Sequence, residues 1–283
     1  MRYSAPVQAS ERGDGPGPPD TGYYDRTYTP SAGDLNARIR QRAFGEDIGQ
    51  FSWTTADEHR RFQLDLGIDE ASTVLDVASG SGGPALFLVR STGCRVVGID
   101  LHEGGVDAAT RAAERAGLAD RASFLVHDVR ERLPFDDRSF DAIISIDSIN
   151  HVFDRGPVFA EWRRVLRPNG RAVYTDAVVV TGPLRREEMD ARSGSMGEFV
   201  FTPAGADEPL LREAGFADVR IEDVTGNIVD VAARWRAARE ELARELDEAE
   251  GPEANAAFQS FLRTVHLLAA EGRLSRLAYH VEG

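Results

Sequence analysis

Strand-like and helix-like segments alternate along the chain from Thr73 onwards, and this alternation limits the possible folds more than any other feature of the sequence. Strands that alternate with helices form a largely parallel, doubly wound α/β sheet with helices on both faces. The amphipathic segments span 85–90, 106–116 and 157–166. The strand-like runs are TVLDV, RVVGI, ASFLV, FDAIISI, RAVYT, DVRIED and RLAYHV.

Composition argues against a nucleic-acid-binding protein and against a membrane protein. The 283 residues carry 33 basic and 47 acidic side chains, a formal net charge of -14, whereas a protein that coats nucleic acid needs a basic face. No apolar run approaches the roughly 20 residues that a membrane-spanning helix needs, and the N-terminus lacks the pattern of a secretory signal. With a single cysteine, Cys94, which we expect to be buried, we predict a cytoplasmic protein.

Composition and patterning divide the chain into five parts. A tail rich in Gly, Pro and Ser, which we expect to be disordered, precedes a helical cover segment. In the cover, Thr55-x-x-Glu58 predicts a capping box that opens a helix through about Leu66. After the α/β domain, apolar residues at helical spacing predict an insertion that closes over the core or forms a lid, and a final strand follows. The five parts span 1–22, 23–70, 71–226, 227–272 and 273–283.

The first predicted strand runs into the glycine-rich loop ASGSGG. Glycines let a ligand approach the backbone closely, and the free N–H groups at a helix N-terminus attract polar or anionic groups. Gly80-x-Gly82-x-x-Ala85 fits the dinucleotide fingerprint, with Asp100 as the acid that would bind the ribose hydroxyls. An NAD-dependent oxidoreductase is therefore one interpretation of this loop.

Three features favour a different ligand. Asp76 lies four residues before Gly80, where a carboxylate would repel a pyrophosphate but would suit a ligand that carries an ammonium group. The third strand ends in His127-Asp128-Val129, which offers an acid to an adenine edge. The fourth strand, within FDAIISIDSINHVFDR, is followed by the turn LRPNG. These features favour a ligand that carries an ammonium group over a dinucleotide, although the NAD interpretation stays open.

Together these motifs resemble those of the class I S-adenosylmethionine-dependent methyltransferases, from about Phe44 to the C-terminus. The resemblance implies a Rossmann-like, seven-stranded sheet whose last strand, RLAYHV, is antiparallel. It implies that the glycine loop holds the methionine end of the cofactor, that Asp100 binds the ribose, and that later residues surround the adenine. Because Ala78 replaces the family's first loop glycine, we expect a slightly different turn. The implied cofactor residues are Ser52, Asp76, Ala78, Ser79, Gly80, Gly82, Asp100, Leu101, Asp128, Val129 and Ile146.

The segment SIDSINHVFDR resembles part of phosphoethanolamine and sarcosine/dimethylglycine N-methyltransferases, and FGEDIGQFSW resembles the segment that covers their cofactor. Asp147 and His151 are four residues apart and would share one face of a helical turn. The resemblance implies that Asp147 holds a cationic amine and that His151 orients or deprotonates it. A histidine that only completes the core is the alternative for His151. We therefore favour methyl transfer to the nitrogen of a small molecule.

Aromatic residues predicted near the same edge favour a bulky, hydrophobic acceptor instead. Carbon or oxygen methylation of a terpenoid, polyketide or aromatic intermediate of specialised metabolism is therefore the alternative function. The pocket tyrosine of the N-methyltransferases is Ala177 here, which weakens the amine interpretation. An acidic group on a bulky substrate would then meet Arg185, Arg186 and Arg192. The predicted substrate residues are Phe51, Trp53, Phe153, Phe199 and Trp235, with Phe201 as a further candidate.

The remaining histidines are scattered and lack the spacing of metal ligands, so we predict no metal site built by the protein. The sequence predicts an enzyme that binds S-adenosylmethionine and a small-molecule acceptor, has no nucleic-acid or membrane partner, and assembles as a monomer or homodimer. Two alternatives from other classes of protein stay open, namely an NAD-dependent oxidoreductase and a regulator that binds the cofactor without catalysing a reaction.

Overall fold

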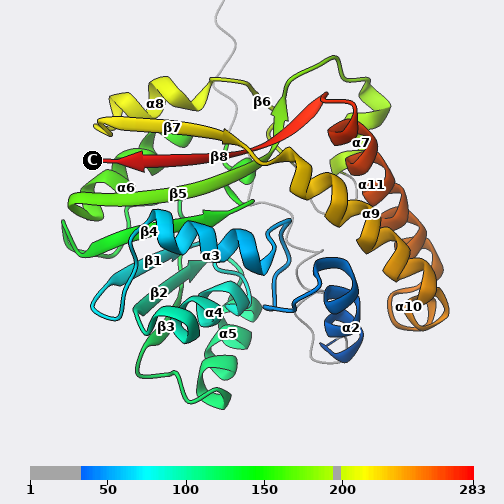
Figure 1. Ribbon diagram of the computed structural model, residues 1–283, viewed down its shortest axis with the longest axis horizontal. Helices are drawn as coiled ribbons and strands as arrows, with labels where there is room; N and C mark the ends of the chain where they lie inside the picture. Colours follow the sequence, from blue (N-terminus) through cyan, green and yellow to red (C-terminus); the bar gives the residue numbers. More distant parts are fainter. Residues whose placement is uncertain (1–32, 194–198) are drawn as a thin grey trace, which may run out of the picture.

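The computed structural model describes residues 33–193 and 199–283, and the tail predicted over 1–22 lies outside them. Seven strands lie side by side in the order β3-β2-β1-β4-β5-β8-β7 (Figure 1). The strands are β1 (Thr73–Val77), β2 (Arg95–Asp100), β3 (Ala122–Val126), β4 (Phe140–Ile146), β5 (Leu166–Val180), β6 (Thr202–Pro203), β7 (Asp218–Asp223) and β8 (Leu274–Glu282).

The strand directions confirm the predicted fold class. The first five strands pair in parallel, and β8 is antiparallel to both β5 and β7. The predicted number of strands is too small by one, because the two-residue strand β6 pairs with β5 and makes the sheet eight-stranded. β5 also begins earlier than predicted. The turn LRPNG lies within it, with Asn169 in the left-handed region at φ 61°.

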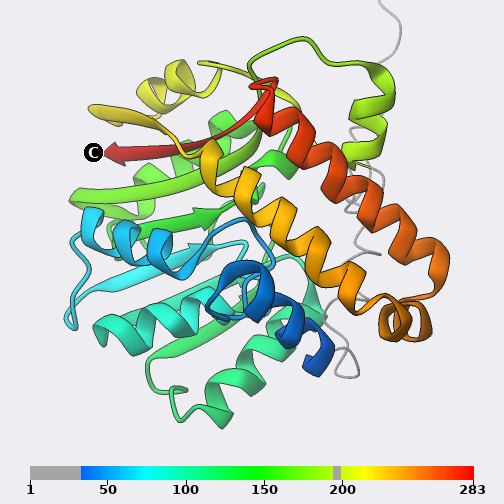
Figure 2. The same cartoon turned by 45° about the vertical axis from the view of Figure 1, so that its right-hand side comes forward.

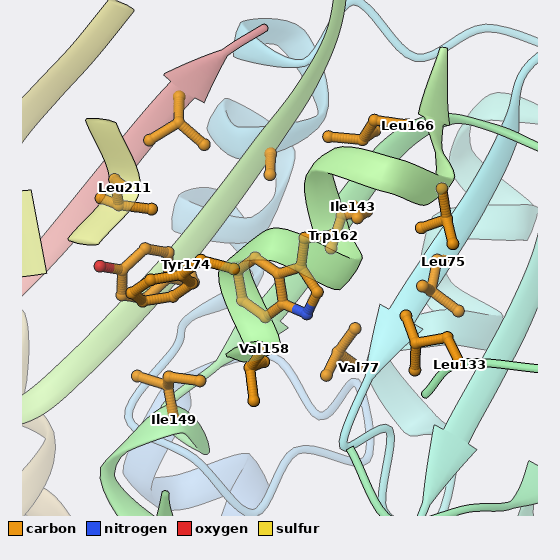
Figure 3. Packing of buried hydrophobic residues seen from close by; sticks show 14 of the residues in the cluster. Leu75, Val77, Leu133, Ile143, Ile149, Val158, Trp162, Leu166, Tyr174 and Leu211 are labelled. Carbon is orange, nitrogen blue, oxygen red and sulfur yellow. The ribbon is translucent and has the colours of Figure 1, made fainter. Parts of the chain in front are cut away.

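Helices cover both faces of the sheet, as alternation of strands and helices requires. On one face, α3, α4 and α5 bury Phe62, Leu88 and Ala113 against the strands. On the other, α6 and α8 bury Trp162 and Leu211, and Figure 3 shows Trp162 between Tyr174 of β5 and Val77 of β1. The helices of these two layers are α3 (Ala56–Asp65), α4 (Gly83–Thr92), α5 (Glu103–Arg115), α6 (Arg155–Val165) and α8 (Asp207–Glu213).

A second core lies beyond the carboxyl edge of the sheet. The helix α2 lies beside α9 in both views, and α11 runs along α9 (Figures 1 and 2). Their apolar faces enclose Phe44, Trp53, Trp235 and Phe261. The predicted insertion therefore consists of three helices that share a core with the N-terminal segment. The remaining helices are α2 (Gly33–Phe44), α7 (Arg186–Ser193), α9 (Thr225–Glu241), α10 (Ala243–Glu250) and α11 (Pro252–Ala270).

The capping box predicted at the start of α3 forms only in part. The Thr55 hydroxyl accepts a hydrogen bond from the Glu58 N–H at 3.2 Å, as predicted. The Glu58 carboxylate instead binds the Arg276 guanidinium at 2.7 Å, because that buried cation is a stronger partner than a backbone N–H. Among the described helices, none is long and apolar enough to cross a membrane.

Candidate active site

The loop between β1 and α4 adopts backbone conformations that favour glycine. Gly80 and Gly82 have φ of 55° and 76°, and a Cβ on Gly82 would lie 2.7 Å from the Ala109 Cβ. Ala78 also lies in the left-handed region, at φ 59°. The alanine therefore keeps a glycine-type conformation, at a cost of about 1–2 kcal/mol for a residue with a Cβ. The loop passes the carboxyl end of β2, where the Ser79 N–H donates to the Ile99 carbonyl at 3.0 Å.

The buried carboxyl of Asp76 and the half-buried carboxyl of Asp100 lie at this end of the sheet. The pKa of Asp76 is raised to about 8, first because burial penalises its charged form and second because Asp100 is close. Asp100 is held in place, since its two oxygens accept hydrogen bonds from the Gly80 and His102 N–H groups, each at 2.8 Å. Burial raises the pKa of Asp100 as well. A ligand with a positive charge would relieve this repulsion.

A buried polar side chain in the loop is also without a partner in the part of the chain that the structure describes. The Ser79 Oγ is buried and has no hydrogen-bond partner among the described residues. Buried hydroxyls are rarely left without a partner, because each costs about 1–3 kcal/mol. The unpaired hydroxyl and the two acids fit a ligand that offers both hydrogen bonds and positive charge.

The residues predicted to surround an adenine lie at the ends of β2, β3 and β4. Leu101 is exposed beside the end of β2, whereas Ile146 and Val129 are half-buried and pack against the core clusters. The Asp128 carboxylate forms an ion pair with the Arg130 guanidinium at 2.6 Å, which lowers its pKa. The sequence interpretation did not include Arg130, although its position two residues after Asp128 is visible in the sequence.

The carboxylate of Asp147 already has a protein cation as its partner. Its Oδ1 accepts hydrogen bonds from the Arg276 Nε at 2.8 Å and from the Thr175 hydroxyl at 2.7 Å. Its Oδ2 accepts the Trp53 N–H at 2.8 Å. An amine would have to displace the fully buried Arg276, so this geometry does not favour the amine-binding role predicted for Asp147. An arginine within the apolar run RLAYHV was the sequence signal for this pair.

His151 lies on a 3-10 turn, η2 (Ile149–His151), after the end of β4. Asp147 precedes this turn in the left-handed region, at φ 53°, so the helical turn expected over 147–151 is confined to its last three residues. The His151 ring is half-buried, and its centroid lies 4.7 Å from that of Phe199. The fold therefore brings together His151 and one predicted substrate residue.

The other predicted substrate residues do not form one wall. Trp53 and Trp235 are core residues, each 5% exposed, with ring centroids 5.6 Å apart. Phe153 is 63% exposed. Half-buried Phe51 lies below the Arg40 guanidinium at 5.1 Å. The set therefore divides into buried rings of the second core, the exposed Phe153, and rings at the edge of the site.

The three arginines predicted to meet an acidic substrate also differ in their surroundings. Arg192 is buried, with its guanidinium over the Phe199 and Phe261 rings at 4.4 and 4.9 Å. Arg185 and Arg186 are exposed. In the ranges 33–193 and 199–283, no group of three or more His, Cys, Asp or Glu side chains has the arrangement of a metal site.

Known proteins share this fold and sequence. Residues 75–174 match the family described as methyltransferase domain. The 27-O-demethylrifamycin SV methyltransferase of Amycolatopsis mediterranei is 31% identical over 243 residues, which cover 81% of this chain and 89% of that protein. The sarcosine/dimethylglycine N-methyltransferase of Halorhodospira halochloris is 31% identical over 214 residues, 73% of this chain and 70% of that protein. Phosphoethanolamine N-methyltransferase 2 of Haemonchus contortus superposes with a TM-score of 0.77 at 20% identity, over 92% of this chain and 60% of that one.

The fold, the glycine loop and these relatives define an enzyme that transfers a methyl group. The chain belongs to the S-adenosylmethionine-dependent methyltransferases. Its cofactor is S-adenosylmethionine, and the buried acids, Ser79 and the glycine loop fit a nucleoside that carries positive charge. The family assignment removes the NAD-dependent alternative.

Affinity for the product nucleoside should depend on pH through Asp76. Its folded pKa of about 8 lies above the value of 3.8 for a solvent-exposed aspartate, so the ligand-free fold loses stability as pH rises across this interval. A ligand ammonium favours the ionised form, so affinity for S-adenosylhomocysteine should rise up to about tenfold per pH unit from about pH 6 to about pH 8. Calorimetry should show this slope in the wild type and a flat profile in Asp76→Asn. Equal slopes would remove Asp76 from the site.

Asp100→Ala should weaken binding of S-adenosylhomocysteine by about 1–3 kcal/mol, because a buried hydrogen-bond acceptor is lost. Calorimetry at constant pH measures this change. The control Asp107→Ala removes a carboxylate from the exposed surface of α5 and should leave the affinity unchanged. Unchanged affinity in Asp100→Ala would contradict its predicted contact with the ribose.

Proposed function

We propose that the enzyme methylates a hydroxyl oxygen on a bulky, largely apolar intermediate of specialised metabolism, with His151 as the general base. The observation that carries this proposal is the pairing of Asp147 with Arg276 at 2.8 Å, close in sequence to His151. Because both oxygens of the Asp147 carboxylate already accept hydrogen bonds from Arg276, Thr175 and Trp53, an amine would have to displace one of these partners. A hydroxyl must lose a proton when it is methylated, and in this proposal His151 accepts that proton.

The cofactor side of the proposal assigns roles to the predicted residues. Asp76 and the loop Ala78–Gly82 hold the amino-acid end of S-adenosylmethionine, and Asp100 accepts hydrogen bonds from the ribose. The bound cofactor supplies a methyl group on a positively charged sulfur. The adenine is surrounded by Leu101, Asp128, Val129 and Ile146, and Ser52 belongs to the segment that covers the nucleoside.

On the acceptor side, the protein's own residues orient the substrate and move its proton. Phe199 contacts the His151 ring and limits its rotation. The His151 imidazole accepts the proton of the acceptor hydroxyl, which makes the oxygen a better nucleophile. The second core, formed by α2, α9 and α11, acts as a lid that excludes water from the reacting atoms. A cytoplasmic location is proposed from the single, buried Cys94.

Methylation of an amine nitrogen is the second candidate. The specific support for it is the 31% identity to a sarcosine/dimethylglycine N-methyltransferase over 73% of this chain. The first candidate is supported by the relative named for 27-O-demethylrifamycin SV, which aligns over 81%.

Mass spectrometry with an isotopically labelled methyl donor would decide between these functions. The acceptors would include 27-O-demethylrifamycin SV, other hydroxylated macrocycles, sarcosine and phosphoethanolamine. We expect label on a hydroxyl oxygen of a macrocycle and none on the amines. Label on sarcosine or phosphoethanolamine would overturn the proposal in favour of nitrogen methylation.

Replacing His151 should slow turnover without changing cofactor affinity. His151→Ala and His151→Gln should each lower kcat on the hydroxylated acceptor by about 10²–10⁴-fold, the range for loss of a general base. S-adenosylhomocysteine should bind both variants as it binds the wild type. The fall in rate that a general base imposes at low pH should disappear in His151→Gln. A variant that retains the wild-type rate and pH profile would assign His151 to the core.

A further inference from the structure

The side chain of Arg276 lies at an irregularity in the sheet. Along β8, Leu277 pairs with Asp176 and Ser275 pairs with Val179, so two residues of β5 face the single residue Arg276. Such a β-bulge turns side chains away from the regular alternation and is common beside active sites. Here the bulge lies opposite Arg276, a residue within β8 that is 0% exposed.

Arg276 joins three parts of the chain that are distant in sequence. Its guanidinium contacts the Glu58 carboxylate of α3 at 2.7 Å and the Asp147 carboxylate after β4 at 2.8 Å. It also donates to the Thr175 hydroxyl of β5 at 3.3 Å. Glu58 and Asp147 are themselves buried, with side-chain exposures of 6% and 5%. A buried arginine between two carboxylates is costly to desolvate, so it is weak evidence for a purely stabilising role.

The contacts continue from Asp147 into the N-terminal cover segment 23–70, in its part that spans residues 45–65. The Trp53 N–H donates to Asp147 at 2.8 Å, and the Trp53 carbonyl accepts the Asn227 side-chain amide at 3.2 Å. The Trp53 ring stacks on that of Phe261, with centroids 6.1 Å apart. The cover therefore has two connections to Arg276. Glu58 on α3 contacts Arg276 directly, whereas the Trp53 backbone is connected to it through Asp147.

The cover touches the helix that follows the cofactor loop. A Cβ on Gly83, the first residue of α4, would lie 2.5 Å from the Gly49 carbonyl oxygen. The two backbones are therefore in direct contact immediately after Gly82 of the loop. A displacement of the cover at Trp53 would be transmitted over four residues to this contact.

We propose that Arg276 is a positioning residue that holds the cover against the cofactor loop and fixes the start of the segment leading to His151. Arg276 acts through Glu58 and Asp147. The proposal rests on the assignment of the glycine loop as the cofactor site. It gives Asp147 a role in closing the site, which nothing in its own segment of sequence indicates.

Three variants test this role: Arg276→Met, Arg276→Lys and the neutral triple variant Glu58→Gln/Asp147→Asn/Arg276→Met. Arg276→Met leaves two buried carboxylates unpaired, and we expect its melting temperature to fall. The triple variant has no unpaired charge, so we expect its melting temperature to recover towards that of the wild type. In Arg276→Met and in the triple variant we expect the cover to be closed in only about a tenth of the molecules. S-adenosylhomocysteine should then bind these two variants about tenfold more weakly than it binds the wild type.

Hydrogen exchange supplies a readout that a merely structural residue would not change. With saturating S-adenosylhomocysteine, peptides from 45–65 should be protected in the wild type and should exchange faster in Arg276→Met and in the triple variant. Arg276→Lys keeps the charge and should recover part of the affinity and the protection. As a control, Arg164→Met on α6 breaks the ion pairs with Glu161 of the same helix and with Asp137, which precedes β4, and should change neither affinity nor protection of the cover.

The outcomes separate this inference from the assignment of the site. If the triple variant recovers its melting temperature together with wild-type affinity and protection, Arg276 is only structural and the proposal fails. If Arg276→Met itself binds S-adenosylhomocysteine like the wild type, the proposal also fails. If the wild type binds no S-adenosylhomocysteine, or binds it without involving Asp76 and Asp100, the assignment of the cofactor site fails instead.

Discussion

The burial of the Asp76 carboxyl beside Asp100 is the constraint on which the rest of the site depends. Asp76 lies one residue before the end of β1, Asp100 is the last residue of the neighbouring parallel strand β2, and burial raises the pKa of both. The left-handed turns of the glycine loop aim the Gly80 N–H at Asp100 and fix its position. With a pKa of about 8, the Asp76 carboxyl is largely protonated at neutral pH, and the positive charge of S-adenosylmethionine would favour its ionised form.

The two halves of the site handle charge differently. On the cofactor side, positive charge must come from the ligand, whereas on the acceptor side Arg276 supplies it from β8. A second buried arginine, Arg155 of α6, pairs with Asp176 of β5 and with Asp207 of α8 at 2.8 and 2.5 Å. Two buried arginines therefore each hold a pair of carboxylates along this part of the sheet.

The sequence predicts the α/β sheet well because its alternation of strands and helices is a repeated local pattern that many residues share, and the resemblance to a family implied the antiparallel last strand. Single long-range contacts were not predictable in this way. The pairing of Arg276 with Asp147 depends on a bulge in β5, and apolar patterns carry no signal for a bulge. Trp53 and Trp235 were placed in the substrate pocket because an aromatic residue has the same pattern in a core as in a pocket. The two-residue strand β6 is too short to have a pattern of its own.

The second core also has a consequence for how the molecule is made. Its N-terminal members, on α2 and around Trp53, pack against residues of α9 and α11, and the cover is attached to Arg276 near the C-terminus. During synthesis, the first helices leave the ribosome long before these partners exist. The α/β sheet up to β5, with α3 packed against it, can begin to form earlier, but α2 and the Trp53 ring lack their partners until α9 and α11 have emerged. The second core can therefore be completed only after α11 has been made.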